Sequence, residues 1–129
     1  MRNVLVFALG DEPHALELRW LREIFTLVAL TPVPTAPPAL LGVVNFKGAI
    51  VPVLDLRVLL AVAAPARPLQ PGDALLLVDV DGTRVALAVD RIDAVTAVDD
   101  GVASPPLADP VALVAAARAH IEGAHGARA

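Results

Sequence analysis

The chain has 129 residues, a formal net charge of −4 and 57% hydrophobic residues. This length suits one domain, and the apolar share excludes an intrinsically disordered protein. Ten Lys and Arg do not provide the basic face that nucleic-acid binding needs. The absence of cysteine excludes disulfides, thiol nucleophiles and cysteine-bound metals. Because no uninterrupted apolar run reaches the roughly 18 residues of a membrane span, we expect a soluble, cytoplasmic chain.

The core is predicted to be aliphatic, because Ala, Leu and Val dominate and aromatic residues make up only 3%. Residues 4–9 form an apolar run that ends at a turn signal over residues 10–13, and residues 15–20 alternate apolar and polar. These segments predict a β-hairpin. Residues 21–30 fit either a strand or a helix, and the prolines that follow would end a helix there.

Two further short strands are predicted at residues 43–46 and 50–54, joined by a tight lysine–glycine turn. Pro52 has no N–H to donate, which places the second of these strands at an edge or a bulge. Asp55 is predicted to cap a short helix over residues 56–60.

The second half begins with an apolar strand over residues 74–80. The dipeptide Asp81-Gly82 predicts a hairpin turn, because glycine accepts the positive φ that such turns need. The strand that returns is predicted over residues 84–89, and another over residues 92–98.

A C-terminal helix is predicted over residues 109–123, followed by a tail over residues 124–129. Asp109 is a good N-cap, Pro110 suits the first helical position, and Gly123 is expected to end the helix. The face expected to pack on the second lobe of the domain is a stripe of small and aliphatic residues: Val111, Leu113, Val114, Ala117 and Ile121.

These elements together predict an all-β fold with minor helices, either a barrel or a sandwich, as one domain over residues 1–129. The chain lacks the alternation of strands and helices that a dinucleotide-binding sheet requires. The fold class therefore gives no reason to expect a nucleotide cofactor.

Residues suited to catalysis are scarce. His120 and His125 are five apart, which does not stack them as a metal-binding pair on a helix, and His14 is expected to be solvated in a turn. Ser104 lacks the Gly-x-Ser-x-Gly context of a nucleophile elbow, and no glycine-rich phosphate loop is present. We expect no catalytic residue, no metal and no cofactor.

The remaining charged groups favour structural roles. The segment Asp79-x-Asp81-Gly82 lacks the glycine and glutamate spacing of a calcium loop, so a hairpin turn is the better interpretation. The nearby charges of Asp55 and Arg57 are interpreted as a local surface pair, and Asp90-Arg91 likewise. Such pairs contribute little to stability.

Glu23 and Lys47 stand in apolar surroundings. Glu23 precedes Ile24 and Phe25, and Lys47 follows Phe46. A charge of this kind lies either on a partly dry binding face or on the solvated surface, and the spacing alone leaves both readings open.

The segment over residues 42–57, Gly-Val-Val-Asn-Phe-Lys-Gly-Ala-Ile-Val-Pro-Val-Leu-Asp-Leu-Arg, resembles the signature of the CheW family, the adaptor proteins of bacterial chemosensory arrays. Three further segments, 4–20, 21–24 and 75–95, resemble the family in the same order. The resemblance implies a non-enzymatic protein made of two small SH3-like β-barrel lobes, five-stranded in the family, that share an aliphatic core.

The resemblance also implies partners. They are the cytoplasmic tip of a methyl-accepting chemoreceptor and a regulatory domain of a CheA-type histidine kinase, at chemosensory arrays, with no nucleic acid and no membrane insertion. A receptor's helical hairpin suits an apolar groove that carries one acid and one base. The receptor-binding residues implied are Leu21, Glu23, Gly42, Lys47, Gly48, Leu75 and Val95.

Two departures from the family pattern stand out. Lys47 replaces the usual arginine, which keeps the charge but loses the planar, bidentate fork. The closing strand of the family is missing after Gly123, so the C-terminal helix is expected to take its place across the open barrel edge. The chain is similar in this to the reduced CheW-like adaptors of the Frizzy system of gliding bacteria.

Several functions stay open at this point. A reduced adaptor would bind the receptor and modulate its coupling to the kinase with weak or no kinase docking, whereas a full adaptor would couple both. A small-ligand-binding or hydrolytic β-barrel would need a pocket with converging His and Asp side chains. A dimeric structural module would pair through the open barrel edge.

Overall fold

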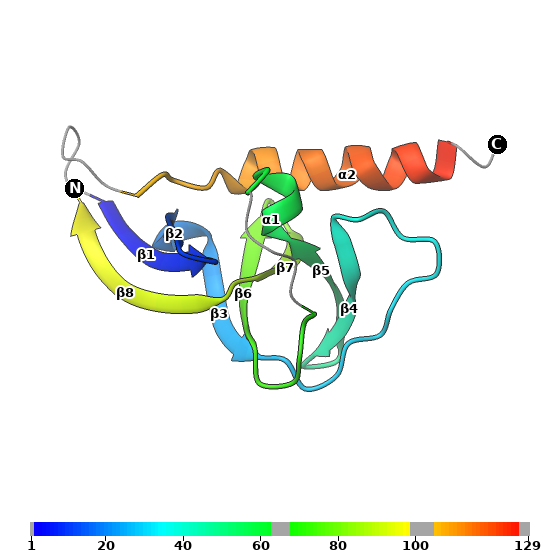
Figure 1. The fold of residues 1–129 in the computed structure, drawn as a ribbon, viewed down its shortest axis with the longest axis horizontal. Helices are drawn as coiled ribbons and strands as arrows, with labels where there is room; N and C mark the ends of the chain where they lie inside the picture. The colour runs from blue at the N-terminus through cyan, green and yellow to red at the C-terminus, as the bar shows by residue number, and fades with distance from the viewer. Residues whose placement is uncertain (1, 63–67, 99–104, 127–129) are drawn as a thin grey trace.

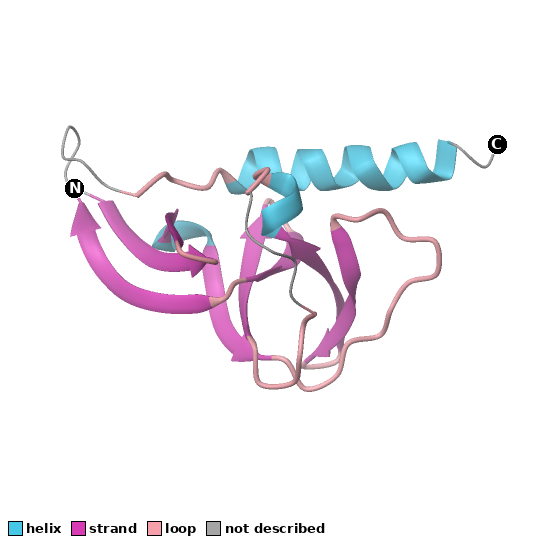
Figure 2. Ribbon diagram, viewed as in Figure 1, coloured by secondary structure: helices cyan, strands magenta, loops and turns pink. Residues whose placement is uncertain are grey.

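The computed structural model describes residues 2–62, 68–98 and 105–126. The strands form two sheets, one of three strands in the order β2-β1-β8 and one of five in the order β3-β6-β7-β5-β4 (Figures 1 and 2). Mostly β structure in two lobes, with a C-terminal helix, confirms the predicted fold class. No helix in the described ranges is long and apolar enough to cross a membrane.

The elements are few and short. The first lobe contains β1 (Arg2–Leu9), β2 (Glu12–Glu17) and β8 (Arg91–Val98). The second lobe contains β3 (Leu21–Thr26), β4 (Leu40–Phe46), β5 (Ala49–Asp55), β6 (Ala74–Val80) and β7 (Thr83–Ala88). The helical elements are η1 (Leu18–Trp20), α1 (Leu56–Leu59) and α2 (Pro110–Gly126).

The chain leaves the first lobe earlier than its alternation predicts. Strand β2 stops at Glu17, and Leu18–Trp20 form a single 3₁₀ turn that leads into β3. In this turn Leu18 and Trp20 both pack against the hydrophobic core. A continued strand would also place both side chains on one face, so the apolar–polar alternation alone does not distinguish the turn from a strand. The Arg19 guanidinium lies 4.6 Å from the centre of the half-buried Trp20 ring.

Two hairpin turns of the second lobe share one construction. Lys47 and Gly48 have φ of 48° and 86°, and Asp81 and Gly82 have 51° and 87°, which are the positive values of a type I′ turn. In each turn the side chain three residues before the glycine accepts a hydrogen bond from the glycine N–H: Asn45 at 3.0 Å and Asp79 at 2.8 Å. Both predicted turns are confirmed.

The sheet of the second lobe curls until its outer strands meet. The rings of Phe25 on β3 and Phe46 on β4 lie 4.7 Å apart. Thr31, in the segment after β3, exchanges two backbone hydrogen bonds of 2.9 Å with Val43 on β4. This lobe is therefore a closed five-stranded barrel.

Pro52 lies where its missing N–H costs no ladder bond. Strand β5 pairs with β4 over most of its length, but its parallel pairing with β7 is confined to Val53, Leu54 and Asp55. Pro52 directly precedes that parallel ladder. The predicted edge or bulge is wrong, because β5 lies between β7 and β4 and the register shift of its pair with β4 falls at Leu40–Gly42. The Asp55 side chain accepts a hydrogen bond from the Arg57 N–H and caps α1, as expected.

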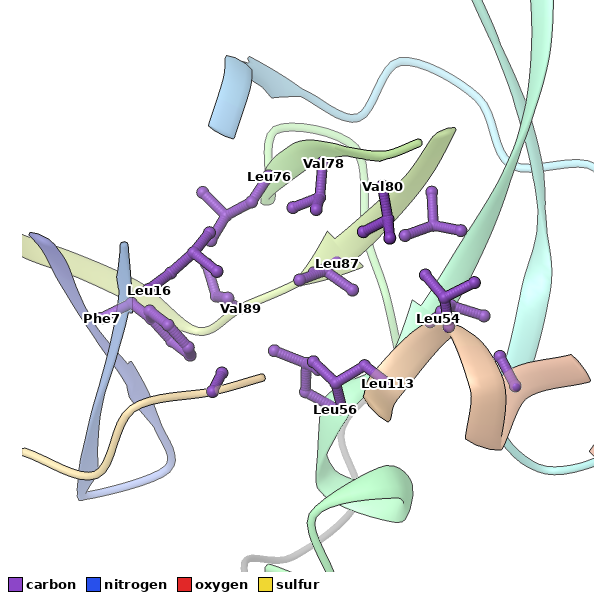
Figure 3. Close-up of a cluster of buried hydrophobic side chains, with 14 of the residues drawn as sticks. Phe7, Leu16, Leu54, Leu56, Leu76, Val78, Val80, Leu87, Val89 and Leu113 are labelled. Carbon is purple, nitrogen blue, oxygen red and sulfur yellow. The ribbon is translucent and has the colours of Figure 1, made fainter. Parts of the chain in front are cut away.

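One aliphatic cluster, here called the shared core, joins both lobes and α2 (Figure 3). Its buried members are Leu5, Phe7, Leu9, Leu16, Leu54, Leu56, Leu76, Val78, Val80, Val85, Leu87, Val89, Ala108, Leu113, Val114 and Ala117. A second cluster fills the five-stranded barrel: Leu27, Val44, Val51, Val53, Leu75, Leu77 and Ala86.

Helix α2 packs on the shared core with part of the predicted stripe. Leu113, Val114 and Ala117 are buried, whereas Val111 is half exposed. The side chain of Ile121 lies outside the described part of the chain. Asp109 caps the helix as predicted, since its carboxylate accepts hydrogen bonds from the N–H groups of the first turn.

The helix continues to Gly126, past the end predicted at Gly123. A lone glycine costs about 1 kcal/mol in a helix, which an alanine-rich sequence tolerates. The segment before the helix adds to the first lobe instead: Ala15 on β2 donates to the Pro106 carbonyl at 2.9 Å and accepts from the Ala108 N–H at 2.7 Å. An extended segment, rather than the helix itself, therefore pairs with the outer edge of β2.

A partly buried carboxylate ties the two lobes together. Asp90, between β7 and β8, accepts hydrogen bonds from the Gly10 N–H in the first lobe and from the Arg57 guanidinium on α1. The predicted local surface pairs, Asp55 with Arg57 and Asp90 with Arg91, are wrong, because Arg57 pairs with Asp90 instead. The ion pair that forms links positions 33 residues apart and is partly buried.

We expect Leu113→Ala to lower the free energy of unfolding by about 2–4 kcal/mol, because it leaves a cavity in the shared core. The matched control is Val111→Ala on the same helix, which should cost less than about 1 kcal/mol because Val111 is 50% exposed. Urea denaturation followed by circular dichroism measures both. Equal losses would show that α2 does not pack as described.

Candidate functional site

The sequence-predicted acid and base come together on the second lobe. Lys47 lies at the tip of the β4–β5 hairpin and Glu23 lies on β3, and the Lys47 Nζ atom is 3.4 Å from the Glu23 Oε2 atom. The side chains are 73% and 42% exposed, respectively. An ion pair this open contributes little to folding and leaves both groups available to a partner.

An aromatic pair lies beside these charges. The Lys47 Nζ atom is 5.2 Å from the centre of the Phe46 ring, within the range of a cation–π contact. Phe46 in turn contacts Phe25 at a ring tilt of 37°. Glu23 and Phe25 are both half-buried and occupy alternate positions on one face of β3, so the charges and the rings form one continuous surface.

A groove of about 260 Å³ opens next to the aromatic pair. It runs between the end of β3 and strand β4, and Val28 at its rim is 83% exposed. Its lining is mostly apolar: Phe25, Thr26, Leu27, Val28, Ala29, Val44, Asn45 and Phe46. An apolar groove bordered by one acid and one base can hold an amphipathic segment of a partner protein.

The other predicted site residues divide between surface and interior. Leu21 is half-buried on β3, two residues before Glu23, and Gly48 is exposed in the hairpin turn. Leu75 and Gly42 are buried, so neither lines a surface groove as predicted. Val95 is exposed on β8, in the other lobe.

The burial of Gly42 and Leu75 has a structural cause. A Cβ atom at Gly42 would lie 2.6 Å from the Thr31 carbonyl oxygen, so the glycine is needed for β4 to approach the preceding segment. Leu75 pairs with Phe25 across β3 and β6 and belongs to the barrel cluster. Both residues therefore support the site through backbone and core packing, without reaching its surface.

Sequence reasoning underestimated the aromatic residues of this surface. Phe25 and Phe46 were noted only as neighbours of the two charges, and Val28 was not singled out. The sequence did contain a signal: two of the only three Phe in the chain lie within two residues of Glu23 or Lys47.

Within the described residues, the structure offers no constellation for catalysis or metal binding. His14 is buried rather than solvated as predicted: its ring stacks on Phe7 with centres 5.9 Å apart, and its Nε2 atom is 3.1 Å from Glu12 Oε1. No group of three or more His, Asp or Glu in these residues is placed to hold a metal ion. Ser104 lies outside the described residues.

Comparisons with known proteins agree with this architecture. Residues 3–124 match the family described as CheW-like domain. The "Chemotaxis protein CheW" of Rhizobium meliloti (strain 1021) is 29% identical over 99 residues, covering 77% of this chain and 63% of that protein. The "Probable chemotaxis protein CheW" of Rhizobium etli is 30% identical over 104 residues, covering 81% and 66%.

A solved structure is similar as well. The scaffolding protein TtCheW from Thermoanaerobacter tengcongensis gives a TM-score of 0.69 at 23% identity, with 81% of this chain and 75% of that chain covered. This likeness supports the two-lobed fold. The chain spans about two thirds of the length of the curated relatives it matches.

The fold and the site define a two-lobed SH3-like β protein with an exposed acid–base pair on an apolar surface. The family match over nearly the whole sequence shows that the chain belongs to the CheW-like domain family. The similar proteins carry the names of chemotaxis and scaffolding proteins, which agrees with the expectation of a non-enzymatic chain.

We expect exchange of the two charges, Glu23→Lys with Lys47→Glu, to change the free energy of unfolding by less than about 1 kcal/mol, because the pair is exposed. Gly42→Ala should lower it by about 1–3 kcal/mol, because the added Cβ meets a backbone oxygen. Urea denaturation distinguishes the two. A large loss in the charge-exchanged variant would assign the pair a structural role.

Proposed function

We propose that the chain is a non-enzymatic chemosensory adaptor that binds the cytoplasmic tip of a chemoreceptor. The observation that carries the proposal is the Glu23–Lys47 pair, which lies beside Phe46 at the hairpin that bears the family signature. The names of the relatives, chemotaxis and scaffolding proteins, support the same class of function. In this proposal the chain acts in the cytoplasm, at chemosensory arrays, as a single CheW-like unit.

The receptor tip is a helical hairpin, and an amphipathic helix presents apolar side chains flanked by charges. In the proposed complex its apolar face covers the groove beside Phe25 and Phe46. Its charged side chains form new ion pairs with Glu23 and Lys47, which replace the solvent-exposed pair between these two residues. The receptor-facing residues proposed are Leu21, Glu23, Lys47, Gly48 and Val95.

Lys47 gives this contact a particular character. The ammonium group is a compact charge with rotatable donors, whereas the arginine of the family signature is a planar fork that binds a carboxylate through two bonds. We therefore propose weaker or differently directed contact with a receptor carboxylate than an arginine would make, and Lys47→Arg should tighten binding.

We further propose that the chain is a reduced adaptor, of the kind known from the Frizzy system, with weak or no docking of a CheA-type kinase. The support is that the first lobe has three strands in the described residues, against five in the second. A lobe with fewer strands presents a remodelled docking face. The alternative is a full adaptor that couples receptor and kinase.

A receptor-tip fragment tests the site. Glu23→Lys should weaken its binding by about 1–3 kcal/mol, as the loss of an interface anchor does, without loss of fold. Asp11→Lys is the matched control, since it makes the same charge change at an exposed turn of the first lobe. Isothermal titration calorimetry measures both. Binding that survives Glu23→Lys unaltered would refute the groove assignment.

The same titration against the regulatory domain of a CheA-type kinase tests the reduced form. The proposal expects receptor binding with kinase binding at least roughly tenfold weaker, a difference of about 1.4 kcal/mol. Equal affinities would favour the full adaptor. A ligand-binding barrel would bind neither protein.

A further inference from the structure

We propose that Asp90 is a positioning residue for the receptor-facing surface. Its pairing with Arg57 and Gly10 sets the angle between the two lobes, and that angle sets how tightly a receptor tip binds. The inference rests on the proposed function, in which the surface draws residues from both lobes: Val95 lies on β8 of the first lobe, and Glu23 lies on β3 of the second. Any rotation of one lobe against the other therefore changes the spacing of the surface.

Asp90 lies where the chain crosses between the lobes. The chain returns from β7 in the second lobe to β8 in the first at this residue. On the side of the first lobe, the Asp90 N–H donates to the Ala8 carbonyl at 3.0 Å and the carboxylate accepts from the Gly10 N–H. On the side of the second lobe, the same carboxylate accepts from the Arg57 guanidinium on α1, which follows β5. These contacts are here called the joint.

The second lobe holds its half of the joint firmly. Asp55 caps α1 by accepting a hydrogen bond from the Arg57 N–H at 3.0 Å, which fixes the backbone that carries the guanidinium. The Arg57 and Asp90 side chains are 15% and 21% exposed, against 73% and 42% for Lys47 and Glu23. Water therefore screens the pair at the joint much less than the exposed pair, and the planar guanidinium gives the contact a fixed direction.

Strand β8 magnifies small changes at the joint. It runs away from the joint along the first lobe (Figure 1), and in the described residues it pairs with β1 alone, so no ladder bond ties it to the second lobe. Val95 is five residues beyond Asp90, or about 16 Å along a strand that rises about 3.3 Å per residue. A rotation of about 5° at the joint would move Val95 by about 1.4 Å. Specific interfaces pack as densely as protein interiors, so a shift of this size loses contacts.

A small cavity allows the joint to open while the domain stays folded. Its volume is about 30 Å³, and Asp55, Arg57 and Asp90 provide its charged lining. A polar cavity of this size has room for water, which can hydrate a charge that loses its partner. The shared core still connects the lobes when the pair is broken. Loss of the pair should therefore appear as a changed angle between the lobes, and not as unfolding.

The angle between the lobes can be measured without any partner. The chain has no native cysteine, so Ala49→Cys and Thr96→Cys place one spin label on an exposed strand position of each lobe. Pulsed electron paramagnetic resonance should give one narrow distance for this labelled chain. Asp90→Asn should shift or broaden that distance, because the amide lacks the charge that binds Arg57. The matched control is Val51→Ala, which truncates a buried side chain of the barrel cluster and should leave the distance unchanged.

Titration of a receptor-tip fragment completes the test, with circular dichroism to confirm that each variant is folded. Asp90→Asn and Arg57→Gln should each weaken binding by roughly tenfold, whereas Val51→Ala should not. Because the two residues act as one pair, the double variant should bind no more weakly than either single variant. Arg57→Lys keeps the charge and should lose less affinity. It takes the place of Asp90→Asn in both measurements if that variant does not fold.

The outcomes separate this proposal from the proposed function. The positioning role is overturned by an unchanged label distance in Asp90→Asn, by unaltered receptor affinity in that variant, or by additive losses in the double variant. An equal loss of affinity in Val51→Ala overturns it as well, because that result assigns the effect to stability alone. If the unsubstituted chain does not bind the receptor tip, the proposed function fails and this proposal fails with it.

Discussion

The arrangement of this molecule depends on one constraint: both lobes and the C-terminal helix bury aliphatic side chains in the same cluster. Phe7 and Leu16 from the first lobe, Leu87 from the second and Leu113 from α2 lie in the shared core. A three-stranded sheet must bury its apolar face against another element. The first lobe therefore holds its shape because the second lobe and the helix complete its interior, and the Asp90 carboxylate fixes how the lobes meet.

The construction of the second lobe explains how a weak ion pair can serve the recognition proposed for it. The barrel, the type I′ turn and the two Phe rings hold Glu23 and Lys47 in place, so the pair does not have to hold the barrel together. In the proposed function, stability and recognition therefore rest on different residues. Gly42 and Leu75 support this surface from the barrel side, while the exposed charges carry the proposed contact.

The sequence predicted best those features that depend on local backbone chemistry. The turns at Lys47 and Asp81 and the cap at Asp109 follow from which residues accept positive φ or offer an acceptor. The helix end at Gly123 was wrong because an isolated glycine is a weak stop in an alanine-rich helix. The burial of Leu75 and the pairing of Asp90 with a distant arginine depend on tertiary contacts, which periodicity and spacing do not encode.

The position of the only tryptophan gives the molecule a built-in optical reporter. Trp20 ends the 3₁₀ turn between the lobes, packs on the shared core, and directly precedes the strand that carries Leu21 and Glu23. Because the chain has one tryptophan and no tyrosine, fluorescence excited at the long-wavelength edge of protein absorption comes from Trp20 alone. The emission wavelength and lifetime of Trp20 therefore report the hydration of the junction between the lobes. Binding of a macromolecule over the neighbouring strand can be followed by this fluorescence in real time, without a label.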